Sequence, residues 1–177
     1  DSVGFINSLR EKDINSFNYL QGVFNFKKKH FKKAENYFKK VENDDPNYID
    51  AIKEFSKIKL KKNEFELLKK FFEAECEKIG VDKDLEIRLI LVETEIFYNE
   101  KDYKYSMTRV NYGLEKYKNN GAFLYTRALV AEKLDRFDIL EEDLKKLIEM
   151  EPKNAQAYNA LGYTWADNNI RLKEAHK

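Results

Sequence analysis

One segment of the chain, residues 121–154, reads GAFLYTRALVAEKLDRFDILEEDLKKLIEMEPKN. Its second half begins at the aromatic residue Phe137, and Leu140 and Leu144 follow three and seven residues later. Apolar residues at this spacing lie on one face of a helix. The small residue Ala128 stands nine positions before Phe137, within a first apolar stretch. The segment therefore predicts two successive amphipathic helices, the second starting near Phe137.

The same pattern occurs four times. An aromatic residue opens the predicted second helix at Phe31, Phe65, Tyr103 and Phe137, and these anchors are 34, 38 and 34 residues apart. The residues three positions after them are Ala34, Leu68, Ser106 and Leu140, and those seven positions after them are Phe38, Phe72, Val110 and Leu144. A period of this length is typical of an array of stacked helix pairs.

A small residue precedes each anchor by nine positions. These residues are Gly22, Ser56, Thr94 and Ala128, and one further period of 34 leads to Gly162. Glycine inside a helix costs about 1 kcal/mol relative to alanine, so a packing reason is needed. We expect a neighbouring helix to approach closely at these repeat-packing positions.

The turn residues set the phase of the repeats. Pro46 and Pro152 each lie 15 residues after an anchor, with Asn47 and Asn154 nearby as candidate helix caps. Gly80 and Gly121 are expected to terminate helices in the frames without proline. The predicted frames are 15–48, 49–82, 87–120, 121–154 and 155–177, the last incomplete, with residues 1–14 the tail of a preceding helix. We expect both ends to be cut from a longer array.

Composition narrows the class of protein. Hydrophobic residues make up 42% and charged residues 37%, with a net charge of +1, which favours a folded chain over a disordered one. The single cysteine, Cys76, excludes an internal disulfide. No run of 18 apolar residues predicts a transmembrane helix, and no signal peptide is visible in a chain that starts at Asp1.

The spacing of the anchors, small residues and prolines resembles the tetratricopeptide repeat. Frame 155–177 carries Tyr158, Leu161, Gly162, Trp165 and Ala175 at the bulky, small and alanine positions of that family. The resemblance implies an all-α, right-handed superhelical solenoid of antiparallel helix pairs. It departs from the family where a large apolar residue should precede the small one, because Gln21, Glu93 and Arg127 stand there. Leu68 and Leu140 also stand where the family has alanine in the second helix, and we expect irregular superhelical geometry around these five residues.

A narrower resemblance covers residues 124–175. It is to long repeat proteins of the proteobacterial envelope, often outer-membrane lipoproteins facing the periplasm, some of which are adaptors for proteases or assembly factors. It implies a bacterial protein located in the periplasm or at the outer membrane, with the cytoplasm as the alternative.

The family resemblance also implies a binding face. First helices line the inner, concave side of such solenoids and usually hold the ligand. The positions expected to point inward are Tyr19, Val23 and Phe26, then Lys53, Lys57 and Leu60, then Leu91, Glu95 and Tyr98, then Tyr125, Leu129 and Glu132, and finally Asn159, Tyr163 and Ala166. Tyrosine is a frequent hot spot of binding. The alternative is that these tyrosines and leucines belong to the core.

We therefore expect a non-catalytic scaffold or adaptor that binds a protein or peptide, without a small-molecule substrate. Self-association through the solenoid ends, as an assembly spacer, is the structural alternative. The lysines between Lys27 and Lys40 leave nucleic-acid binding as a third, less favoured reading. A clamp for chaperone C-termini is disfavoured, since Lys53 and Lys57 lack the asparagine partner.

Residues for catalysis are scarce. Neither His30 nor His176 has metal-ligand neighbours at a suitable spacing, and the phosphate-binding and nucleophile motifs are absent from the sequence. Cys76 lies between Glu75 and Glu77, which would raise its pKa rather than activate it. We predict no enzyme activity, no cofactor and no metal.

Overall fold

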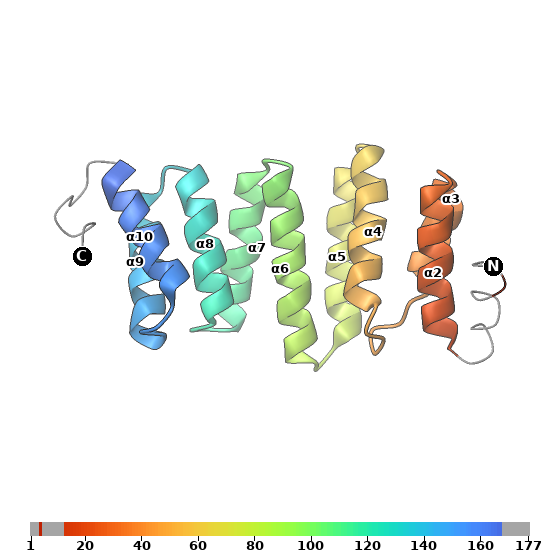
Figure 1. The fold of residues 1–177 in the computed structure, drawn as a ribbon, viewed down its shortest axis with the longest axis horizontal. Helices are drawn as coiled ribbons and strands as arrows, with labels where there is room; N and C mark the ends of the chain where they lie inside the picture. Colours follow the sequence, from red (N-terminus) through yellow and green to blue (C-terminus); the bar gives the residue numbers. More distant parts are fainter. Residues whose placement is uncertain (1–3, 5–12, 168–177) are drawn as a thin grey trace. The chain divides into compact units, whose positions relative to one another are not determined.

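The structure is a computed structural model that describes residue 4 and residues 13–167 of the 177-residue chain. This described part is built from α-helices joined by short turns and contains no β-strand, which confirms the predicted all-α fold (Figure 1). It forms two compact units, residues 1–89 (unit 1) and residues 90–177 (unit 2). Most of the predicted tail 1–14 and the last part of frame 155–177 lie outside the described residues.

Unit 1 contains two helix pairs. Its helices are α2 (Ile14–Lys27), α3 (Phe31–Phe38), α4 (Tyr48–Lys61) and α5 (Phe65–Ile79). Each helix packs on the next one along the chain, and α2 also contacts α4. The buried side chains of Phe38, Phe55, Leu68 and Phe72 come from the facing sides of these helices. Burial of one such side chain contributes about 1.5–3 kcal/mol, so the shared core holds the pairs together.

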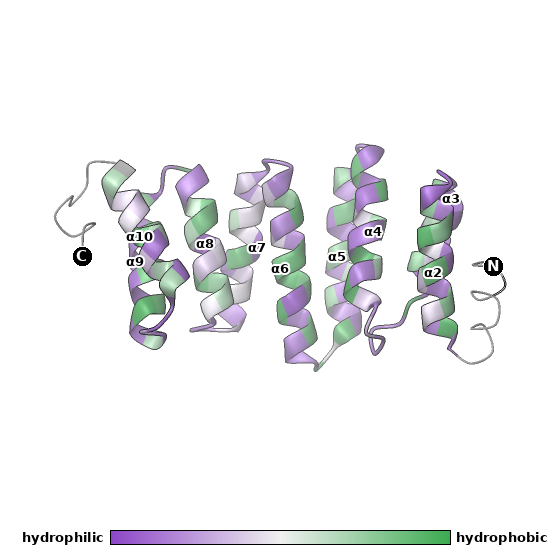
Figure 2. Cartoon of the chain, viewed as in Figure 1, coloured by the Kyte–Doolittle hydropathy of each residue, from purple (hydrophilic) through white to green (hydrophobic). Residues whose placement is uncertain are grey.

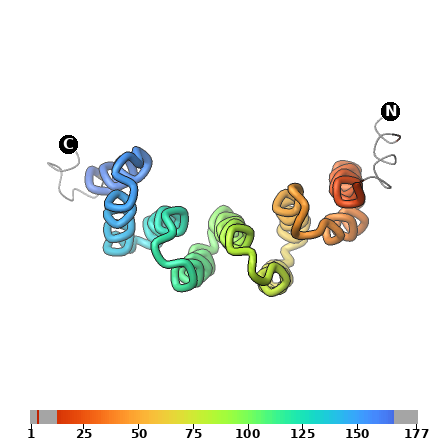
Figure 3. The backbone as a smooth tube through the Cα atoms, turned by 90° about the horizontal axis from the view of Figure 1, so that it is seen from below, coloured from red at the N-terminus to blue at the C-terminus, as the bar shows by residue number. Residues whose placement is uncertain are grey.

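Unit 2 continues the arrangement. The helix α6 (Lys83–Asn99) crosses the boundary between the units, and it is followed by α7 (Tyr103–Lys116), α8 (Gly121–Lys133), α9 (Phe137–Met150) and α10 (Ala155–Asp167). Figure 3 shows these helices nearly end-on, and α8 packs between α7 and α9 while α10 packs on α9. Their core joins Leu124, Ala128, Ala131, Leu140, Leu144, Leu147, Ala157 and Leu161.

The aromatic anchors mark helix starts as predicted. The helices α3, α5, α7 and α9 begin at Phe31, Phe65, Tyr103 and Phe137 respectively. Apolar and polar residues are interleaved along each helix in Figure 2, as expected of helices that bury one face and expose the other. The spacing of apolar residues therefore identified the second helix of each described pair.

The predicted helix ends are confirmed in part. Gly80 ends α5 with a φ of 68°, which suits glycine. Asn154 accepts a hydrogen bond from the Ala157 backbone N–H at 3.0 Å, as a cap at the start of α10 should. The prediction that Gly121 terminates a helix is wrong. Gly121 is the first residue of α8, because Asn120 before it caps the Phe123 N–H at 3.1 Å.

One turn geometry recurs between the two helices of each described pair. The residue two positions before each anchor has a positive φ: Lys29 (60°), Asn63 (56°), Lys101 (64°) and Asp135 (56°). The next residue donates its N–H to the carbonyl five positions back, for example from Asp102 to Phe97 at 2.9 Å. This is the Schellman ending of a helix, and it usually carries glycine at the left-handed position. Here the turn recurs without glycine, so composition did not reveal it.

Candidate functional site

The small residues occupy close contacts. A Cβ added at Gly22 would meet the ring of Phe38, so the α2–α3 contact requires glycine there. Ser56, Thr94 and Ala128 are buried, at 1%, 0% and 1% exposure. The hydroxyls of Ser56 and Thr94 each donate to the carbonyl four residues back at 2.8 Å, which satisfies them inside the core. Gly162 is half-buried on α10.

The polar residues that depart from the family pattern have partners. Glu93 on α6 is fully buried and accepts from Arg109 Nε on α7 at 2.7 Å and from the Tyr105 hydroxyl at 2.6 Å. In the next pair Arg127 on α8 donates to both oxygens of Asp143 on α9, at 2.7 and 2.6 Å. Each pair joins residues that are 16 positions apart, across the two helices of one repeat.

The corresponding positions in unit 1 also meet. Phe55 and Phe71, again 16 positions apart, have ring centroids at 4.3 Å. One register position therefore joins the two helices of a repeat by aromatic packing in one repeat and by buried ion pairs in two others. Two of the departures from the family pattern, Glu93 and Arg127, are thus each paired with a residue of opposite charge at the other end of this contact.

A groove in unit 2 brings together five of the predicted inward-facing residues. Leu91, Glu95 and Tyr98 come from α6, and Tyr125 and Leu129 come from α8. We call this the α6–α8 groove; its volume is about 640 Å³. Its remaining lining residues are Asn99, Gly121, Ala122, Thr126, Val130, Leu147, Glu151, Asn154 and Gln156. The spacing of Leu91, Glu95 and Tyr98 places all three on one face of α6, which explains why they meet here.

The tyrosines give the groove an amphipathic wall. Tyr98 and Tyr125 are half-buried, and the ring of Tyr98 packs edge-on against Tyr103 with centroids 5.3 Å apart. Burial raises the pKa of Tyr98; Lys133 acts against this and Glu132 adds to it. Tyr98 therefore remains a neutral phenol that offers an apolar face and a hydrogen-bonding tip. Leu91 and Leu129 are also half-buried, so the floor of the groove is apolar.

The remaining predicted residues of unit 2 lie elsewhere. A smaller cavity of about 310 Å³ joins Leu129, Glu132 and Tyr163. Asn159 and Tyr163 also border a third cavity between α9 and α10, together with Gly162, Trp165 and Ala166. Tyr163 is 73% exposed, so it belongs to the surface rather than the core. The inward-facing set of the last frame is thus separate from the α6–α8 groove.

In unit 1 the predicted inward-facing residues divide between packing and solvent. Tyr19 packs toward Phe38 with centroids 6.3 Å apart, and burial, then the charges of Asp50 and Glu54, raise its pKa. Phe26 packs against Phe31 at 5.7 Å, under the ammonium of Lys61. Val23, Lys53 and Leu60 are half-buried, and the exposed Lys57 pairs with Glu54.

The lysine-rich region is held by neighbouring groups. Lys28, Lys39 and Lys40 lie over the rings of Phe24, Phe55 and Tyr37 respectively, at 4.3–5.6 Å. Such contacts are attractive because the ring face is negative. All three lysines remain exposed to solvent.

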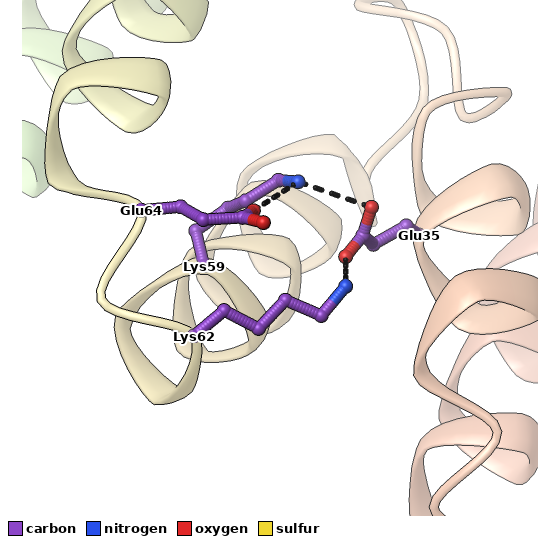
Figure 4. A network of polar contacts seen from close by, with 4 residues as sticks. All are labelled: Glu35, Lys59, Lys62 and Glu64. Carbon is purple, nitrogen blue, oxygen red and sulfur yellow. Dashed lines mark hydrogen bonds and ion pairs between the residues drawn. The ribbon is translucent and has the colours of Figure 1, made fainter.

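An ion-pair network joins the two repeats of unit 1. Glu35 on α3 reaches toward Lys59 and Lys62, and Lys59 also contacts Glu64 (Figure 4). The Lys59 Nζ lies 3.1 Å from Glu35 and 2.7 Å from Glu64. Burial acts to raise the pKa of Glu35, but the hydrogen bonds from Lys62 and Lys59 outweigh it and lower the pKa.

Within residues 13–167, no group of three or more His, Cys, Asp or Glu side chains could hold a metal ion. None of the helices in the described part of the chain is long and apolar enough to span a membrane.

The sequence of the chain is similar to part of one known repeat protein. No family model matches the chain. A TPR repeat-containing protein of Pseudomonas aeruginosa, PA4667, is 39% identical over 94 residues, which are 53% of this chain and 16% of that protein. The matched stretch is thus a small part of a much longer relative.

Solved structures show the same fold. One crystal structure of MamA has a TM-score of 0.56 at 16% identity, covering 92% of this chain and 86% of MamA. YrrB is described as a TPR protein with an unusual peptide-binding site. Its structure has a TM-score of 0.54 at 14% identity, and the match covers 96% of this chain and 86% of YrrB. At these identities the likeness concerns the fold alone. Together with the repeat spacing and the related sequence, it shows that this chain has an all-α fold like that of tetratricopeptide-repeat proteins.

Proposed function

We propose that this chain is a non-catalytic scaffold and that the α6–α8 groove binds a peptide segment of a partner protein. One observation carries the proposal: five of the six positions inferred from the repeat pattern on two successive first helices line one groove. A groove of this kind offers apolar area together with oriented polar groups, which is what peptide recognition uses.

The tyrosines would supply most of the affinity. Tyr98 and Tyr125 present large, half-buried rings with few rotatable bonds, so little side-chain entropy is lost when a peptide covers them. Asn99 and Gln156 border the groove with amides that can pair with a peptide backbone. The structure of YrrB, which shares the fold, supports the view that this architecture can hold a peptide.

The test compares three forms of the chain as bait in a bacterial lysate, followed by mass spectrometry. These are the wild type, Tyr98→Ala/Tyr125→Ala, and the control Tyr112→Ala. Tyr112 is 39% exposed on α7 and lies outside the groove, so the control removes the same side chain from another face. We expect a partner that wild type and control retain and the double variant loses, with about tenfold weaker binding per hot-spot tyrosine.

Circular dichroism must show that the double variant keeps its helices. If a folded double variant captures the same partners as the wild type, binding lies on another surface and the assignment of the groove is wrong.

A further inference from the structure

We infer that the α6–α8 groove selects peptides in which a lysine or arginine stands next to an apolar residue. The inference rests on the proposed function and names the chemistry of the ligand. Among the residues that line the groove, two carry a negative charge, Glu95 and Glu151, and none carries a positive charge. The other lining residues are apolar or neutral and polar.

Glu95 is placed to meet a cation above the apolar floor. It is exposed on α6, one turn from Leu91 and one from Tyr98, so its carboxylate shares their face of the helix. The described residues include no ion pair to Glu95. A ligand cation that binds there does not have to displace a lysine or arginine of this chain.

Glu151 borders the groove from the other side, and a glycine makes room for it. A Cβ at Gly121 would lie 2.6 Å from Glu151 Oε1, so a side chain at that position would push the carboxylate away. The other oxygen, Oε2, accepts from Asn154 Nδ2 at 2.8 Å, a neutral donor that leaves the negative charge in place. The start of α8 offsets part of this charge through its helix dipole. Glu95 should therefore contribute more than Glu151.

A nearby cation of the chain is already engaged. The charge of Lys133 acts to lower the pKa of Tyr98. Its ammonium, however, lies 3.3 Å from the carboxylate of Glu132. The repeat position of Glu95 is Lys57 in the preceding frame and Leu129 in the following one. The charge preference therefore belongs to this groove and not to the repeat in general.

The tyrosines reinforce the choice of ligand. A guanidinium or ammonium stacks favourably on a tyrosine face and pairs with a carboxylate at its edge. Leu91 and Leu129 provide the apolar floor for the neighbouring residue of the ligand. A basic side chain flanked by an apolar one satisfies both parts of the groove.

The experiment selects ligands without assuming a sequence. Phage displaying random dodecapeptides are selected on the whole wild-type chain, and enriched peptides are synthesised with a fluorescent label. Binding is measured by anisotropy to the wild type, Glu95→Lys, Glu151→Lys, Tyr98→Ala/Tyr125→Ala and the control Glu115→Lys. Glu115 is exposed on α7 and does not line the groove, so the control makes the same charge change elsewhere.

We expect peptides that lose affinity on the tyrosine double variant to carry lysine or arginine beside an apolar residue. Their affinity should fall about tenfold on Glu95→Lys, by less on Glu151→Lys, and by less than about twofold on Glu115→Lys. If the peptides that depend on the tyrosines are neutral or acidic, or bind Glu95→Lys as well as the wild type, the charge preference is refuted while the groove stands. If no enriched peptide depends on the tyrosines, the inference and the proposed groove both fail.

Discussion

Replacing Arg127 by methionine should destabilise unit 2 by about 3–5 kcal/mol. The reason is Asp143, which is 1% exposed and accepts two hydrogen bonds from the guanidinium, at 2.7 and 2.6 Å. Methionine keeps the apolar stem but leaves a carboxylate buried without a cation. Removing one partner of a buried pair costs far more than the pair itself contributes.

Replacing the partner, Asp143, should destabilise the protein less. In Asp143→Leu the guanidinium of Arg127 keeps a side-chain exposure of 24% and a hydrogen bond to Asn111 at 3.2 Å. We therefore expect a loss of about 1–3 kcal/mol. The double variant Arg127→Met/Asp143→Leu replaces both charges with apolar groups and should lie within about 1 kcal/mol of the wild type.

Urea unfolding of the four forms gives a double-mutant cycle. The fluorescence of Trp165, the single tryptophan of the chain, reports on unit 2 because Trp165 packs against its core. Circular dichroism of the whole chain provides a second probe, since repeat arrays can unfold in more than one step. A double variant as unstable as the sum of the single ones, or an Arg127→Met cost under about 1 kcal/mol, would refute the argument.

Three further changes test other parts of the structure. Lys101→Gly should increase the free energy of unfolding by about 1 kcal/mol and raise the melting temperature by about 2–4 °C, because Lys101 has a φ of 64° that glycine adopts without strain. The control Lys146→Gly lies within α9 and should lower the melting temperature. Glu35→Gln should lower stability at about pH 7 in urea titrations, and its difference from the wild type should shrink as the pH falls below 4.5. The lowered pKa of Glu35 adds stability above the ordinary value of 4.5, and this is lost as the pH falls through the folded-state pKa. Gly22→Ala should cost about 1–3 kcal/mol in urea unfolding, since its methyl group would meet Phe38; an unchanged midpoint would contradict that packing.

The helices were predictable because their signal is local. Phe137, Leu140 and Leu144 define a face within two turns, and the same spacing recurs at each anchor, so the start of α9 and its counterparts followed from periodicity. Gly121 shows the limit of residue-type rules. Glycine favours helix ends in general, but Asn120 caps the helix that begins beside it, and the cap decides the outcome here.

The sequence predicted which residues share a face of each helix, but not which helix faces line one groove. Leu91, Glu95 and Tyr98 share a face by helical spacing, and the structure joins that face to Tyr125 and Leu129. Glu151 was not part of the predicted set, because it follows α9 and reaches the groove through the space beside Gly121. A contact of that kind depends on three-dimensional packing and leaves no periodic signal.

The buried ion pairs explain how similar helices can recognise their own partners. In one repeat the acid is on the first helix and the base on the second, as Glu93 and Arg109; in the next the order is reversed, as Arg127 and Asp143. If α9 took the place of α7 beside α6 in this register, Glu93 would meet Asp143, and if α8 took the place of α6 beside α7, Arg127 would meet Arg109. Each mispairing would bury two like charges, whereas the apolar faces alone would tolerate either arrangement. Glu93 and Arg127, which depart from the repeat pattern, therefore oppose incorrect pairing of the helices.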